Sequence, residues 1–203
     1  MNNHSVTSFN LCLIITVLCI LLVAACKKNG EIEDEADENP YSTFNIEFFR
    51  KLGSLCEEAL EGRTEYPTES GHELRNAKLK FNFTTCADDT IEIDFYINDV
   101  NRNTFLIQVL EDQNLALKLI HKQVDGLNEV ADSYGGIAGD EHILKKSFYA
   151  NEETARLHPQ AFSNVWAFEI DLDNRKLIYR LTRQERIRFK GVFELPASFE
   201  ATI

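Results

Sequence analysis

The sequence lacks the motifs that mark the commonest enzyme sites. It contains no Gly-x-Ser-x-Gly, no Gly-x-x-x-x-Gly-Lys and no Gly-x-Gly-x-x-Gly, the patterns of many hydrolases, of phosphate-binding loops and of dinucleotide-binding folds. It also contains no His-x-x-x-His and no Cys-x-x-Cys, spacings at which two side chains often hold zinc. These absences disfavour an enzyme without excluding one, and they indicate no cofactor and no metal.

No apolar run reaches the usual length of a membrane-spanning helix. The longest, residues 11–25, has about three quarters of the roughly 20 residues that cross a bilayer, and it ends in small residues before Cys26. This layout is typical of a cleaved export signal. Its ending resembles the lipobox of bacterial lipoproteins, in which the cysteine becomes the first residue and is acylated. We therefore expect a signal peptide over 1–25 and a lipid anchor, including palmitate, on Cys26.

A second interpretation of the same segment stays open. Residues 1–10 contain no Lys or Arg, whereas Lys27 and Lys28 follow the apolar run. Positive charge remains on the cytoplasmic side of a membrane, so these features favour a reversed signal anchor with a cytoplasmic domain. The small residues before Cys26 favour the lipoprotein.

Positive charge is scarce overall. The net charge is −12, which disfavours nucleic acid and anionic membrane surfaces as partners. Residues 31–38 are mostly Asp and Glu, and such a segment repels itself and buries little apolar area. We expect residues 26–44 to form a lipidated acidic tether, either as a plain spacer or as a sorting signal for the outer membrane. The expected location is the bacterial cell envelope, with the domain facing the periplasm or the cell surface.

Cysteine is also scarce. Two of the five cysteines lie within the expected signal, and Cys26 is the expected lipid site. Cys56 and Cys86 remain as an even pair in an oxidising compartment, where disulfides form. A bond closing about 30 residues contributes about 3–4 kcal/mol in the chain-entropy model. The alternative is a pair of buried free thiols.

Hydrophobic periodicity predicts one helix followed by strands. Apolar residues recur at spacings of three and four over 45–61, which indicates an amphipathic helix ended by Gly62. Residues 63–77 are expected to form a loop, and residues 152–157 a helical turn. Alternating apolar and polar residues predict antiparallel strands over 79–83, 91–97, 105–109, 115–121, 130–134, 144–149, 164–171, 176–182 and 187–195.

These elements define the expected fold. They form a mainly β domain over 45–203, an antiparallel meander of eight or nine short strands curled into a small barrel or sandwich, with one N-terminal amphipathic helix. The expected inward residues include the aromatic side chains of Phe81, Phe83, Phe95, Phe105 and Phe193.

Several polar or aromatic residues are candidates for a ligand site or an active site. His121 shares a strand face with Leu115, Leu117 and Leu119, and the other interpretation is a hydrogen-bonded or hydrated strand end. Trp166 is a pocket wall or core packing. Imidazole beside carboxylate suits a general base or zinc, although a solvated loop explains the loop positions equally well. The candidates are His121, Tyr134, Asp140, His142, His158 and Trp166, of which Asp140 and His142 follow a glycine-containing loop at 135–139.

A basic band near the C-terminus contrasts with the acidic composition. Arg180, Arg183, Arg186, Arg188 and Lys190 form this band. Pairing with the acidic residues at 92 and 94 on a neighbouring strand explains it structurally. The functional alternative is a site for anionic head groups or glycans.

The chain resembles a family of exported bacterial proteins of unknown function. The resemblance covers most of 55–195, and the tyrosine-glycine-glycine and asparagine-valine-tryptophan motifs fall in the family's order. It implies the fold and the cysteine pair, and no reaction. The matching segments are 58–63 (EALEGR), 86–93 (CADDTIEI), 117–121 (LKLIH), 133–136 (SYGG), 148–154 (FYANEET), 164–170 (NVWAFEI) and 188–194 (RFKGVFE).

The leading expectation is a non-enzymatic module that binds a small apolar or amphipathic ligand at the barrel mouth or a concave face, because barrels of about eight strands enclose one such molecule. An enzyme using His121, His142 and His158 is an alternative, and it requires at least two imidazoles to meet in one cleft. A structural partner of envelope assemblies is another, and it requires a sizeable exposed apolar patch.

Overall fold

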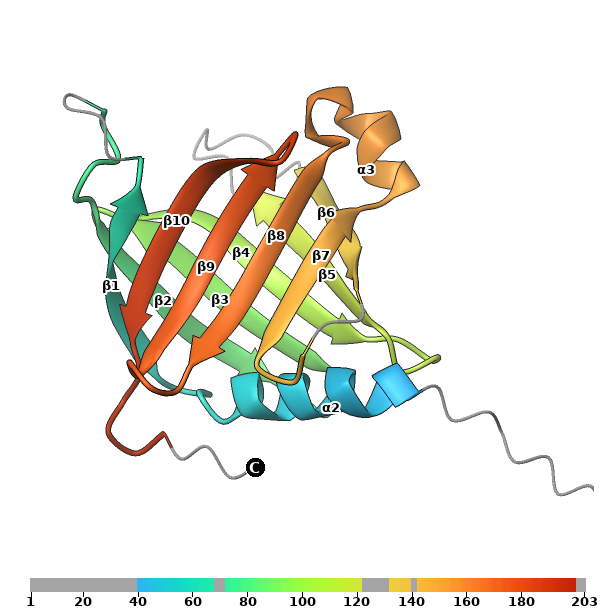
Figure 1. The fold of residues 1–203 in the computed structure, drawn as a ribbon, viewed down its shortest axis with the longest axis horizontal. Helices are drawn as coiled ribbons and strands as arrows, with labels where there is room; N and C mark the ends of the chain where they lie inside the picture. The colour runs from blue at the N-terminus through green and yellow to red at the C-terminus, as the bar shows by residue number, and fades with distance from the viewer. Residues whose placement is uncertain (1–39, 68–71, 122–131, 140–141, 200–203) are drawn as a thin grey trace, which may run out of the picture. The chain divides into compact units, whose positions relative to one another are not determined.

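The computed structural model describes residues 40–67, 72–121, 132–139 and 142–199, and its centre is a closed antiparallel barrel (Figure 1). Each strand pairs with its neighbours in sequence, and β1 also pairs with β10. The prediction of a mainly β antiparallel fold is confirmed, although the described residues form ten strands and not eight or nine. They are β1 (Ala59–Tyr66), β2 (Lys78–Cys86), β3 (Thr90–Ile97), β4 (Val100–Val109), β5 (Leu115–His121), β6 (Asp132–Ala138), β7 (Lys145–Ala150), β8 (Asn164–Asp171), β9 (Lys176–Arg183) and β10 (Arg186–Glu194).

Strand β1 is the element that closes the barrel, and the sequence did not indicate it. Its residues were expected partly as helix and partly as loop. The strand is polar, and Gly62 sits at its centre. A Cβ atom on Gly62 would lie 2.5 Å from the carbonyl oxygen of Val192 on β10. Glycine therefore allows the close approach of two strands here, and it does not end a helix.

Helix α2 (Pro40–Gly53) is shorter at its C-terminal end than the predicted helix over 45–61, and it begins earlier. Proline is favoured in the first turn of a helix because a backbone N–H at that position has no partner within the helix, so proline loses nothing by lacking one. After Gly53 the chain turns, and Glu57 has a positive φ of 65°. The three-and-four spacing continues through Leu60 by coincidence, because Leu60 points inward from β1.

Strand β6 contains Gly135 and Gly136, two of the three glycines of the loop expected at 135–139. A Cβ atom on Gly135 would lie 1.8 Å from the carbonyl oxygen of Leu117 on β5, and one on Gly136 would lie 2.2 Å from that of Tyr149 on β7. β6 is thus pressed between its two neighbours, and only glycine fits this spacing.

Aromatic rings fill the middle of the barrel. Phe81 stacks on Phe193 with ring centroids 3.8 Å apart, and Phe105 meets Tyr179 edge-on at 5.0 Å. Phe95 contacts the same group. The alternation of inward side chains predicted these positions, and burying such rings is a large source of stability.

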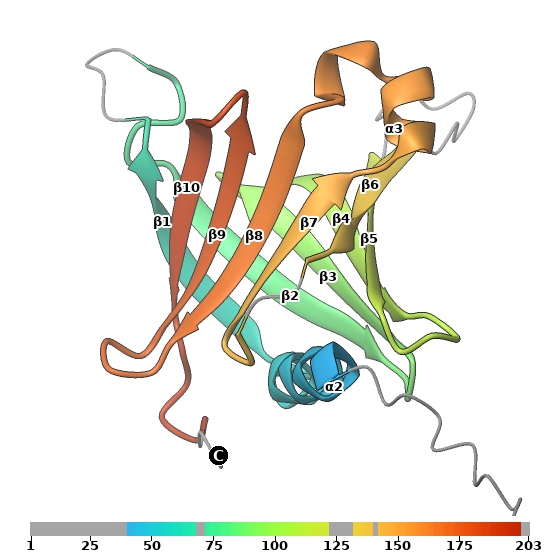
Figure 2. The ribbon, with the colours of Figure 1, turned by 45° about the vertical axis from the view of Figure 1, so that its right-hand side comes forward.

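The two ends of the barrel differ. Helix α2 lies across one end, the α2 end, and the short helices α3 (Glu152–Leu157) and η1 (Pro159–Ala161) lie at the other, the α3 end (Figures 1 and 2). α3 fulfils the prediction of a helical turn over 152–157. The expected signal at 1–25, Cys26 and most of the tether lie outside the described residues, whereas residues 40–44 belong to α2 and not to the tether.

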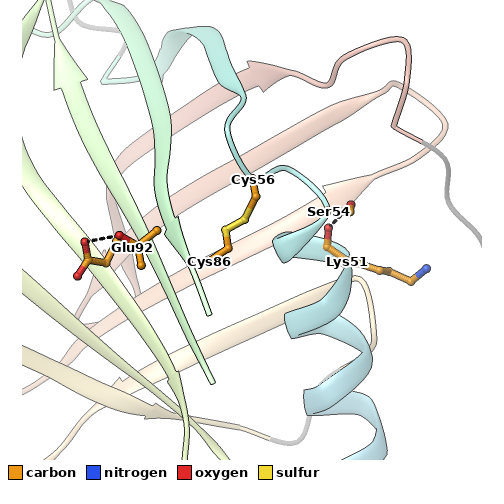
Figure 3. Close-up of a disulfide and its surroundings, with 6 residues drawn as sticks. Lys51, Ser54, Cys56, Cys86 and Glu92 are labelled. Carbon is orange, nitrogen blue, oxygen red and sulfur yellow. Dashed lines mark hydrogen bonds between the residues drawn. A yellow bond between two sulfur atoms is a disulfide. The ribbon is translucent and has the colours of Figure 1, made fainter. Parts of the chain in front are cut away.

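A disulfide joins Cys56, between α2 and β1, to Cys86 at the end of β2, as predicted (Figure 3). Their Cα atoms are 6.1 Å apart, within the usual range. Ser54 hydroxyl donates a hydrogen bond to the backbone oxygen of Lys51 at 2.7 Å, in the last turn of α2. The disulfide therefore ties the segment that follows α2 to the sheet that the helix covers.

No helix among the described residues has the length and apolar character that a membrane span requires.

Candidate functional site

Four of the six candidate residues meet at the α3 end. His121 is the last residue of β5, and Tyr134 lies opposite Leu119 on β6. Trp166 lies near the start of β8, and His158 joins α3 to η1. These four residues, His121, Tyr134, His158 and Trp166, form a group that we name the mouth cluster.

Tyr134 is the centre of the mouth cluster. His121 Nε2 lies 3.1 Å from the Tyr134 hydroxyl oxygen, within hydrogen-bonding distance, and the two rings stack at 5.3 Å. The ring of His158 lies 4.9 Å from that of Tyr134, and the ring of Trp166 lies 5.7 Å away. Two imidazoles and an indole therefore surround one phenol.

Trp166 carries an unusual polar atom. Its side chain is 0% exposed, and its Nε1–H has no hydrogen-bond partner among the described residues. Buried donors are nearly always paired, and leaving one unpaired costs about 1–3 kcal/mol. The mouth cluster thus offers a buried donor to an acceptor from outside the described part of the chain.

A short seam between β6 and β7 shapes this end of the barrel. Only Gly136, Ile137 and Ala138 of β6 pair with β7, so β6 continues past its neighbour toward the α3 end. Beyond that point, helix α3 and not β7 forms hydrogen bonds with β6. The Thr154 hydroxyl donates to the Gly135 carbonyl oxygen at 2.6 Å and accepts from the Gly135 N–H at 2.8 Å. These bonds fix α3, and His158 after it, against the strand that carries Tyr134.

Tyr179 lies beneath the mouth cluster, where the aromatic core begins. Burial in the barrel raises the pKa of Tyr179 above its usual value, and the nearby Tyr134 raises it further. Tyr179 also contacts the rings of Phe105 and Phe168, so it belongs to the apolar centre and not to the polar mouth.

Asn164 and Arg183 also belong to this end, although neither is among the six candidates from the sequence. Asn164 is buried, and its Oδ1 accepts a hydrogen bond of 2.7 Å from Arg183 Nε. Asn164 occupies the same inward face of β8 as Trp166. The alternation in residues 164–170 contained this signal, but the partnership with Arg183 depends on the pairing of β8 with β9.

His142 is not in the mouth cluster. It is exposed at the α2 end and lines a surface recess of about 540 Å³ with Glu169 and Asp171. Its Nδ1 accepts a hydrogen bond from the backbone N–H of Leu144. Of the three imidazoles considered for an enzyme, His121 and His158 therefore meet and His142 does not, because β6 carries the chain to the opposite end. Asp140 lies outside the described residues.

The described residues contain no group of three or more His, Cys, Asp or Glu side chains placed to hold a metal ion. Asp132 pairs in register with His121 across β5 and β6, and its side chain lies outside the description. A second pocket, of about 430 Å³, lies between α2 and the strand ends, lined by Phe49, Arg50, Ile91 and other residues, and it contains none of the six candidates.

The basic band is partly paired, with partners other than those expected. Arg180 and Lys190 face each other across β9 and β10. Arg180 lies 3.8 Å from Glu169, and Lys190 lies 2.8 Å from Glu65. The expected partner Glu92 instead accepts a hydrogen bond from Thr85. Cross-strand pairing thus accounts for the middle of the band and not for its tip.

No family model, no curated protein and no solved structure matches this chain. The function must therefore be inferred from the groups that the mouth cluster offers to a ligand. These are hydrogen-bond donors, aromatic ring faces and two imidazoles that can accept or donate a proton.

Proposed function

We propose that this chain is a lipid-anchored protein of the bacterial cell envelope whose mouth cluster binds a small amphipathic ligand. The observation that carries the binding function is the buried Trp166 Nε1–H, which has no partner among the described residues. A ligand oxygen bonded to this donor would remove the cost of leaving it unpaired.

Two features support a ligand at the mouth and disfavour one in the barrel centre. The rings of Phe81, Phe105 and Phe193 contact one another or their neighbours throughout the centre. At the α3 end, by contrast, His121, Tyr134 and His158 are only partly buried. Aromatic side chains with a few convergent polar groups are typical of small-molecule sites.

Tryptophan emission tests the binding function directly, because Trp166 is the only tryptophan in the chain. We expect dodecanol, kept below its aggregation concentration, to change the emission of Trp166 in a saturable way. Tyr134→Ala removes the ring at the centre of the cluster and is expected to weaken binding at least about tenfold, since such contacts contribute about 1.5 kcal/mol or more. The matched control is Tyr96→Ala, on the outer wall.

The binding function is contradicted if neither dodecanol nor its carboxylate and phosphate analogues alter the emission. It is also contradicted if Tyr96→Ala and Tyr134→Ala weaken the response equally.

The lipid anchor is supported by the sequence around Cys26. Mass spectrometry of the protein extracted from membranes is expected to find acyl chains on an N-terminal Cys26. Cys26→Ser should abolish them, whereas Cys12→Ser, which lies within the expected signal, should not. Recovery of an intact, unacylated chain from the soluble cell interior would contradict the anchor.

An enzyme remains a second candidate, because His121 and His158 both contact Tyr134. Two imidazoles at one site satisfy the minimum for general acid–base catalysis. The test is the fate of a ligand recovered with the protein: chemical conversion by the wild type, lost in His121→Gln, favours the enzyme, and unchanged recovery favours the binding module.

A further inference from the structure

We infer that the ligand of the mouth cluster carries an anionic head group, a carboxylate or a phosphate, which Arg183 binds at the β8–β10 side of the mouth. This inference rests on the proposed binding function and names the class of ligand. It follows from the arrangement of charges and donors on these three strands.

Arg183 is the central residue of the argument. It ends β9, is half-buried, and is aligned by the hydrogen bond from its Nε to Asn164 Oδ1. No described residue accepts a hydrogen bond from its terminal nitrogens. A guanidinium held in this way presents two parallel donors, the geometry that suits carboxylate and phosphate oxygens.

Among the described residues, the hairpin tip that holds Arg183 carries more positive than negative charge. Arg183 pairs in register with Arg186 across the tip, and like charges placed opposite each other are destabilising. Residues 183–188 contain three arginines and one acidic residue, Glu185, in the turn. No ion pair joins Arg183, Arg186 or Arg188 to a described carboxylate, in contrast to the paired middle of the band. A bound anion would supply the missing counter-charge.

Trp166 provides a donor on the same side. It lies two residues from Asn164 on the inward face of β8, and its buried Nε1–H has no described partner. The indole N–H and the guanidinium can donate hydrogen bonds and cannot accept them, so both favour a ligand that carries acceptor oxygens.

Apolar side chains at the same end provide a surface for the rest of the ligand. Leu157 is 46% exposed, Phe162 is 58% exposed and Ile187 is 38% exposed. The first two flank η1, and Ile187 lies at the hairpin tip. Since rings fill the barrel centre, an acyl chain would lie along this apolar rim, with its head group directed to Arg183.

The experiment compares three probes of equal chain length, dodecanoate, dodecyl phosphate and dodecanol, by titration of Trp166 emission. We expect dodecanoate, dodecyl phosphate or both to bind at least about tenfold more tightly than dodecanol. A hydrogen bond to a charged group contributes more free energy than one to a neutral group, and the difference corresponds to about tenfold in affinity. Which anion binds more tightly distinguishes a carboxylate from a phosphate ligand.

Variants assign the preference to the mouth. Arg183→Gln should remove most of the preference for the anionic probes over dodecanol, and Arg186→Gln, at an exposed position, should reduce it. Arg63→Gln removes the same charge from the outer wall, where Arg63 lies 3.9 Å from Glu65, and should leave all three affinities unchanged.

The outcomes separate the two proposals. Equal affinity for the three probes overturns the anionic head group and leaves the binding function intact. An anion preference that survives both Arg183→Gln and Arg186→Gln overturns the assignment to this side of the mouth. No response to any probe overturns the binding function itself.

Discussion

The two ends of the barrel are built from different kinds of side chain. At the α2 end, Phe48, Leu52 and Leu55 are fully buried, and the disulfide holds the chain after the helix. At the α3 end, the mouth cluster is partly exposed and rich in polar atoms, and the short helix there is attached through the Thr154 hydroxyl.

This difference separates stability from chemistry along one axis of the barrel. An apolar, covalently fastened end can be altered only at a large cost in folding free energy. A polar end placed on a filled aromatic centre can change its side chains at a smaller cost. Mutations at the two ends should therefore affect different measurements.

The largest expected effect is at the α2 end. Phe48→Ala should lower the free energy of unfolding by about 3–5 kcal/mol, the range for truncating a buried phenylalanine, while the native emission of Trp166 stays unchanged. Urea unfolding measures it. The control is Phe44→Ala on the same helix, where the side chain is 41% exposed. Equal losses in the two variants would show that α2 does not cover the barrel.

Removing the disulfide should have the next largest effect. Replacing Cys56 and Cys86 by serine should lower the free energy of unfolding by about 2–4 kcal/mol, since the bond restricts the unfolded chain. The affinity for dodecanol should remain that of the wild type, because the bond lies at the other end. A large loss of affinity in folded protein would mean that the two ends are coupled.

A smaller loss is expected where α3 meets β6. Thr154→Val keeps the side-chain shape and leaves the N–H of Gly135 without its partner, while the C=O of Gly135 keeps only the longer bond of 3.4 Å from the Asn151 N–H. The change should cost about 1–3 kcal/mol. Unlike the two previous changes, it should also alter the emission of Trp166, because α3 positions His158. Thr154→Ser retains the hydroxyl and serves as the control. Unaltered emission in Thr154→Val would show that α3 does not position the residues of the mouth cluster.

The smallest effect is a pH dependence at the boundary of the two regions. Since burial raises the pKa of Tyr179 in the folded state, the unfolded chain loses this proton first, at its ordinary value of about 10. Stability from Tyr179 is therefore fully present below pH 10 and falls above it, by at most about 1.4 kcal/mol per pH unit. The free energy of unfolding of Tyr179→Phe should fall less steeply over pH 10–11. If the free energy of unfolding of the two proteins fell equally steeply with pH, Tyr179 would not be the source of this pH dependence.

Local alternation sufficed to predict most of the barrel and part of the site. It placed Phe81, His121 and Trp166 on inward faces because the side-chain period of a strand is two. Strand β1 was missed because its stability comes from pairing with β2 and β10 and not from its own polar residues. Such long-range pairing leaves little trace in a local pattern.

The remainder of the site depends on the topology. Sequence proximity grouped His142 with Asp140 and a supposed loop, whereas the direction of β6 and β7 sends His142 to the far end. The sequence shows Arg183 only as part of a charged stretch, because its partner Asn164 lies 19 residues away in sequence. Hairpin pairing, and not motif spacing, brings these groups together.

Closure of the barrel protects the chain against aggregation through unpaired sheet edges. The ladder between β1 and β10 joins the first strand to the last, so a truncation that removes residues 186–194 would free two sheet edges at once. Unpaired edges recruit strands from other molecules. The closed ring of described strands presents far less unpaired edge, and β10 thus keeps neighbouring copies from pairing edge to edge into aggregates.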